Sequence, residues 1–152
     1  MNRNTIATKA WVIVCDGAKA LFLQNVGTAN AVNLSVVEQM SQPDEATRDL
    51  GTDRPGRAFQ SEGSARSAME ETDWHEKAEA DFLLAVAGRL AALVENGDIQ
   101  DMVLIAPPKA LGLLRPALGA GINNVLRAEI AKDYVKLPVA DIEKHLAALR
   151  AA

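Results

Sequence analysis

Four arginines lie within one long stretch that has neither helical nor strand periodicity. The stretch runs from Ser41 to Thr72, contains few large apolar side chains, and is interrupted by prolines and glycines. Guanidinium groups form bidentate hydrogen bonds with phosphates, and a long irregular segment is commonly functional or becomes ordered on binding. These residue types therefore predict a phosphate-binding surface that is formed by Arg48, Arg54, Arg57 and Arg66.

A second basic surface is expected after the apolar run Met102–Ala106. An uninterrupted apolar run is typical of a strand that is covered on both faces of a sheet. Open α/β sheets bind ligands at the carboxyl ends of their parallel strands. Lys109 and Arg115 follow this strand, so we expect both to assist the arginines in binding RNA or another partner.

Carboxylates keep open the alternative of a metal-dependent nuclease or phosphoesterase. Two metal ions that lie about 4 Å apart need clustered acids, and Asp16 could supply one together with Asp53 or Glu76. The strand Met102–Ala106 ends without an acid, which leaves the constellation incomplete. We expect Asp16 to be a turn residue, and this alternative to be the weaker one.

Other chemistries lack the residues that they require. Cys15 lies in an apolar run and is expected to be a buried, unreactive thiol. His75 and His145 fall on different predicted helices, in no zinc-binding pattern. No phosphate-binding glycine loop or dinucleotide fingerprint is present. We therefore expect neither a cofactor nor a resident metal, and no enzymatic activity.

Apolar patterning predicts the elements that position these residues. The runs Lys9–Cys15 and Ala18–Val26 flank Asp16-Gly17, a strong hairpin signal, and Asn33–Met40 is a third expected strand. A helix is predicted from Asp73 to Gly97, where Asp73 and Glu76 resemble a capping box. After the strand Met102–Ala106 we expect a short helix, a weaker strand and a closing helix, at Ala110–Leu118, Val125–Ala131 and Val139–Leu149.

The predicted order is β-β-β-α-β-α-β-α, which indicates one α/β domain over residues 1–152. Its mixed sheet would carry helices on its faces and a long irregular loop at about residues 41–72. The ribonuclease H-like architecture and the middle domain of archaeal and eukaryotic release factors share this order. Topology of this kind predicts a fold and leaves the function open.

Charge is unevenly distributed along the 152 residues, whose net charge is −4. The segment Ala68–Asp101 contains nine acidic and two basic residues, so the remainder is mildly basic. Aromatic residues are only 4 % of the chain, which argues against stacking of several bases. A single cysteine, the absence of a signal-peptide core and the absence of a membrane-length apolar run predict a cytoplasmic protein without a membrane partner.

Three motifs, taken together, resemble the bacterial host-attachment protein family, which is grouped with bacterial relatives of the release-factor middle domain. They are Trp11–Ala20, Asp53–Phe59 and Ala106–Arg115, and His75-Glu76 before the long helix fits as well. In release factors the loop before that helix carries Gly-Gly-Gln, whose glutamine positions water for peptide release. The corresponding stretch here, Gln60–Ser67, has one glycine and no glutamine after it. The resemblance therefore implies a docking module without peptide-release activity.

Our leading hypothesis is a non-enzymatic cytoplasmic module that binds the ribosome or structured RNA, without DNA specificity. Attachment to host cells would then be an indirect effect, because no export signal is visible. A further alternative is a protein-interaction module that forms a homodimer through its alanine-rich helices, Ala85–Val94 and Ile142–Leu149.

Overall fold

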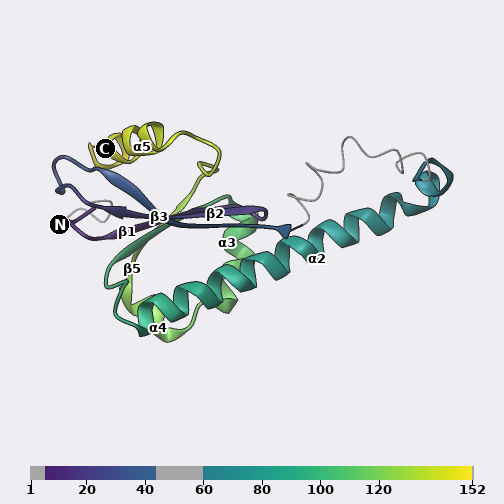
Figure 1. Cartoon of the computed structure of the whole chain (residues 1–152), viewed down its shortest axis with the longest axis horizontal. Coiled ribbons are helices and arrows are strands. Elements are labelled where there is room, and N and C mark those ends of the chain that lie inside the picture. Colours follow the sequence, from purple (N-terminus) through teal and green to yellow (C-terminus); the bar gives the residue numbers. More distant parts are fainter. Residues whose placement is uncertain (1–5, 44–59, 152) are drawn as a thin grey trace.

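The computed structural model describes residues 6–43 and 60–151, with only the helical backbone described for residues 60–72 and 149–151. Its centre is a five-stranded sheet in the order β3-β2-β1-β4-β5 (Figure 1). This confirms the predicted α/β class with one mixed sheet. The strands are β1 (Trp11–Cys15), β2 (Lys19–Asn25), β3 (Leu34–Ser41), β4 (Met102–Ala106) and β5 (Leu126–Ala131).

Strand β1 occupies the middle of the sheet and joins its two halves. It pairs antiparallel with β2 and parallel with β4, and β4 in turn pairs parallel with β5. Every residue of β1 and β4 is buried, as their continuous apolar sequences predict. The carboxyl ends of β1, β4 and β5 consequently lie along one edge of the sheet.

Helices cover both faces of the sheet (Figure 1). Side chains alternate between the two faces of a strand, so Trp11 and Ile13 contribute to the apolar cluster beneath one face, and Val12 and Val14 to the cluster on the other. Among the described helices, three pack on the first face and one packs on the second. They are α2 (Gln60–Glu95), α3 (Pro108–Leu114) and α4 (Ala120–Val125) on the first face, and α5 (Val139–Ala151) on the second.

Helix α2 is much longer than the sequence predicts. It begins at Gln60 rather than Asp73, so residues 60–72, expected to be irregular, are helical, and Asp73 and Glu76 lie inside the helix instead of capping it. The helix has 36 residues, which corresponds to about 54 Å. Its described side chains are buried only from Phe82 onward, and the preceding part extends away from the sheet as an arm (Figure 1). Hydrophobic periodicity reports a buried face, so it cannot reveal a helical arm without one.

The segment between β4 and β5 contains three elements where the sequence predicts one helix. The expected helix Ala110–Leu118 is α3 followed by the 3₁₀ helix η2 (Arg115–Ala117). Helix α4 then precedes β5 and was missed, because its six residues contain few apolar positions for a periodicity to show. No helix in the described part of the chain is long and apolar enough to cross a membrane.

The predicted hairpin between β1 and β2 is confirmed, and Asp16 is its turn residue. Cys15 pairs with Ala20, and Asp16 Oδ1 accepts hydrogen bonds from the backbone N–H groups of Ala18 and Lys19, each at 2.8 Å. Neither Gly17 nor Ala18 has a positive φ. The aspartate side chain therefore stabilises the turn in place of a left-handed backbone.

Asn25, at the end of β2, is a fully buried polar residue that ties three backbone segments together. Its Nδ2 donates to the carbonyl oxygens of Ile6, Ala7 and Thr28, and its Oδ1 accepts from the N–H groups of Gly27 and Asn33. These bonds connect the segment before β1 to the loop between β2 and β3. A shorter side chain would leave one buried and four partly buried backbone groups without these partners.

We predict that Asn25→Ala lowers the free energy of unfolding by roughly 3–5 kcal/mol, because one buried and four partly buried backbone groups lose their partners together. Urea unfolding followed by circular dichroism measures this difference. Asn30→Ala is the matched control, because Asn30 is exposed in the same loop, and it should change the free energy by less than about 0.5 kcal/mol. Equal effects of the two substitutions would contradict the structural role of Asn25.

Candidate functional site

A crevice opens where the carboxyl ends of β1 and β4 meet. The chain leaves β1 toward β2 and leaves β4 toward β5, so the connections diverge from this point in opposite directions. Open α/β sheets bind ligands at such a switch point. The crevice has a volume of about 320 Å³, and its polar lining consists of Asp16, Gln42, His75, Glu79 and Lys109.

Helix α2 and the segment after β3 close the crevice over the hairpin turn. Gln42 Nε2 donates a hydrogen bond to the carbonyl oxygen of Gly17 at 2.5 Å. Glu79 lies directly over Gly17, since a Cβ at that position would be 2.6 Å from Glu79 Oε2. The absence of a side chain at Gly17 thus allows the Glu79 carboxylate to approach the backbone of the turn.

Three lysines lie along the same edge of the sheet, each at a different strand. Lys109 follows β4 in the crevice, Lys132 follows β5, and Lys19 begins β2 opposite the end of β3. Among the residues that the structure describes, none of the three forms an ion pair. Their ammonium groups are therefore available to an anionic ligand.

The arginine surface predicted from the sequence lies mostly outside the described residues. Arg48, Arg54 and Arg57 fall in the gap between residues 43 and 60, and Arg66 is in α2 with its side chain not described. Of the two residues predicted to assist them, Lys109 lines the crevice, whereas Arg115 does not join it. Arg115 Nε instead contacts Glu129 Oε1 on β5 at 2.9 Å.

The described residues contain no cluster of side chains that would support the alternative of a metal site. They contain no group of three or more histidine, cysteine, aspartate or glutamate side chains that could hold an ion. Asp16 uses Oδ1 for the turn, Asp53 lies outside the described part, and Glu76 does not line the crevice. The carboxylate that does face Asp16 from α2 is Glu79, one turn after His75.

Cys15 lies directly beneath the crevice, at the end of β1, and is buried as predicted. Burial, and secondarily the negative charge of Asp16, raise the pKa of its thiol to about 12. A thiol with this pKa is protonated at neutral pH and is a poor nucleophile. The residue therefore serves packing rather than chemistry.

Sequence reasoning missed Gln42, Lys19 and Lys132 as members of this edge. Each adjoins the end of a strand, and this position is the feature of the sequence that could have indicated a site residue. It indicates a shared site only when the strand order is known, and no local pattern specifies the strand order.

Residues 9–146 match bacterial archaeo-eukaryotic release factor family 12. The chain belongs to this family. The match covers the crevice and all five strands, and it supports a module like the middle domain of release factors. No curated protein matches this family 12 chain.

We predict that the Cys15 thiol of this family 12 protein reacts with a disulfide reagent at pH 8 roughly a thousandfold more slowly than in urea, because its pKa lies about three units higher in the folded state. Its folded pKa exceeds the ordinary value of 9.0, so its contribution to stability is complete below that pH and is lost as the pH rises toward 12. The single cysteine makes the assay specific. Native labelling as fast as unfolded labelling would contradict this assignment.

Proposed function

We propose that this protein is a release-factor-like module that binds the ribosome or structured RNA through phosphate contacts and performs no peptide release of its own. Its membership of release factor family 12 supports a role in translation. The departure from Gly-Gly-Gln at Gln60–Ser67 argues against positioning of water on a peptidyl ester. Binding would be directed by phosphates and RNA shape, without specificity for DNA.

The observation that carries this proposal is the row of unpaired lysines beside the arm of α2. Lys19, Lys109 and Lys132 come from separate connections, yet they share the carboxyl edge of the sheet. Helix α2 crosses this edge at His75 and Glu79, and its first turns continue beyond it (Figure 1). A cationic edge next to a projecting helix provides two contact regions for one large, folded polyanion.

The arm adds a second reason. The residues that correspond to the Gly-Gly-Gln loop form the first turns of α2, at the end of the helix farthest from the sheet. A module that presents this tip and anchors itself by the lysine edge can dock in an RNA-lined site without hydrolysing anything. Arg54 and Arg57, which precede the arm, would add phosphate contacts.

Such a role would be exercised in the cytoplasm, and any influence on attachment to host cells would be indirect, through translation. The homodimer alternative stays a prediction, and the described fold limits which side chains of its two helices could take part. The chain's two apolar clusters bury Leu90 and Leu93 of α2 and Ile142 and Leu146 of α5. These four side chains are therefore not available for contact with a second copy of the chain.

We predict that the combined change Lys19→Ala, Lys109→Ala and Lys132→Ala weakens binding to ribosomes at about 50 mM salt and reduces the slope of log K against log [salt] by about 2–3. Each lost phosphate contact removes nearly one unit of slope. Co-sedimentation at several salt concentrations measures both quantities. Arg54→Ala with Arg57→Ala should weaken binding in the same way.

The matched control removes three unpaired lysines from other surfaces, Lys9→Ala, Lys136→Ala and Lys144→Ala, with the same change in net charge. Lys9 precedes β1 at the opposite edge, and the other two lie beside or on α5. This control should retain the salt slope of the wild type. The absence of ribosome or RNA association by the wild type at about 50 mM salt would refute the proposal.

A further inference from the structure

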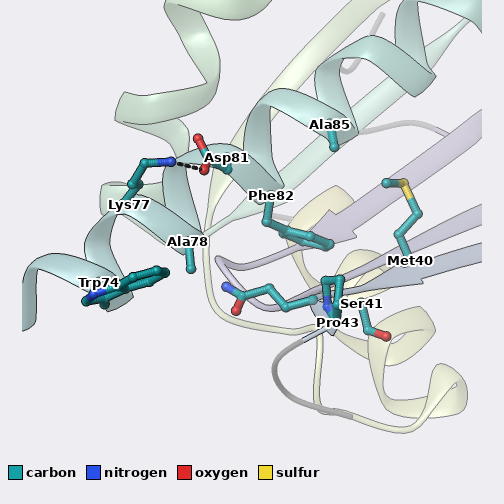
Figure 2. A pocket seen from close by; sticks show the side chains of 10 residues that line it. Met40, Ser41, Pro43, Trp74, Lys77, Ala78, Asp81, Phe82 and Ala85 are labelled. Atoms are coloured by element: carbon teal, nitrogen blue, oxygen red, sulfur yellow. Dashed lines mark hydrogen bonds and ion pairs between the residues drawn. The ribbon is translucent and has the colours of Figure 1, made fainter. Parts of the chain in front are cut away.

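A second, apolar groove runs between the end of β3 and the exposed side of α2 (Figure 2). Its volume is about 440 Å³, and Met40, Phe82 and Ala85 line it. Trp74 lies at its outer end with 69 % of its surface exposed. Because a largely exposed indole is unusual on a chain with so few aromatic residues, this ring is a candidate contact for a partner.

The groove contains an acceptor that is nearly buried and receives no hydrogen bond from any residue that the structure describes. Gln42, which lines the groove as well as the crevice, is only 9 % exposed. Its Nε2 must face the Gly17 carbonyl, since a carbonyl oxygen only accepts, and this orientation fixes the position of Oε1. Within the described residues, no group donates a hydrogen bond to Gln42 Oε1. A ligand with an N–H group would satisfy this atom.

One acid, Asp81, and one base, Lys77, line the groove, and the part of α2 that borders it, residues 73–81, carries four acids and this one lysine. Asp81 lines it and pairs with Lys77 at 2.7 Å, but both side chains are more than half exposed, so the pair is weak and Asp81 can exchange partners. Asp73 and Glu76 lie on the same helix and form no ion pair with a described residue. Phosphate groups would be repelled here, whereas a cation with several N–H donors would be attracted.

We propose that this groove binds an arginine-rich segment of a partner protein. A guanidinium plane stacks on the indole of Trp74 and donates hydrogen bonds to Gln42 Oε1 and to the Asp81 carboxylate. An apolar side chain of the same segment fills the space beside Met40 and Phe82. The groove and the lysine edge thus recognise partners of opposite charge, and the groove does not depend on the RNA-binding proposal.

The test uses the full-length protein and a fluorescein-labelled dodecapeptide in which Gly-Arg-Leu is repeated four times. The comparison peptide replaces each arginine with glutamate. Anisotropy gives affinities, and quenching of tryptophan emission reports contact with Trp74, because Trp11 is only 4 % exposed. We expect the arginine peptide to bind and quench, and the glutamate peptide to do neither.

Trp74→Ala should weaken binding of the arginine peptide about tenfold or more, as expected for an aromatic anchor that also stacks on a cation. Gln42→Met should weaken it about two- to tenfold through the lost acceptor. Asp81→Asn should weaken it at low salt, with the difference vanishing at high salt. The matched controls are Leu84→Ala, an exposed apolar residue outside the groove, and Asp133→Asn, an exposed acid after β5, and both should bind as the wild type does.

Unchanged affinity in Trp74→Ala, or equal binding of the glutamate peptide, would overturn the proposal. So would quenching of Trp74 by an RNA hairpin without any binding of the arginine peptide, because RNA would then be the occupant. The variant that lacks Lys19, Lys109 and Lys132 should bind the peptide as the wild type does. Failure of ribosome binding and failure of peptide binding are therefore separately observable.

Discussion

The parallel pairing of β1 with β4 is the constraint on which the other features of this structure depend. Trp11 pairs with Met102 and Val14 with Ile105, and every residue of both strands is buried. The backbone N–H of Trp11 also donates to the carbonyl oxygen of Asp101, and its Nε1 donates to that of Asp98, which fixes the register at the start of β4. With the register fixed at one end, the other ends of the two strands meet, and the crevice lies between them.

Helix α2 serves two purposes because only part of it is buried. Its carboxyl-terminal part packs on the sheet, and Arg89 attaches it to the edge strand through two hydrogen bonds to Glu38, at 2.6 and 2.7 Å. The hydrogen bonds to Arg89 lower the pKa of the Glu38 carboxyl, so the pair persists at physiological pH. This contact holds α2 beside β3, and the apolar groove lies between the two. The remainder of the helix has no sheet beneath it and projects as the arm.

The net charge of −4 describes neither of the two surfaces. Unpaired lysines gather at the edge of the sheet because strands that are distant in the sequence end there together. The acids gather on α2 because one continuous segment of the chain carries them. The fold therefore gathers three lysines at one edge of the sheet, next to Asp16 and Glu79 in the crevice, and leaves α2 with an excess of acids.

Local sequence was sufficient for the strands and for a few individual residues near the crevice. The buried runs of β1 and β4, the turn at Asp16, the buried Cys15 and the strand-end position of Lys109 all follow from residue type and immediate neighbours. In any fold that buries those strands, apolar side chains must fill them and polar side chains must lie at their ends. The family motifs likewise consist of short runs of consecutive residues.

Tertiary structure alone decided which strand ends became neighbours and how far α2 extends. The strand order β3-β2-β1-β4-β5 brought Gln42, Glu79 and Lys109 into one crevice, although long stretches of chain separate them. It also paired Arg115 with Glu129, outside the crevice. Periodicity shows only where a face is buried, and strand adjacency is set by packing of the whole sheet. For these reasons the sequence by itself determined the elements and several candidate residues, while the shape of the two binding surfaces depended on contacts between distant parts of the chain.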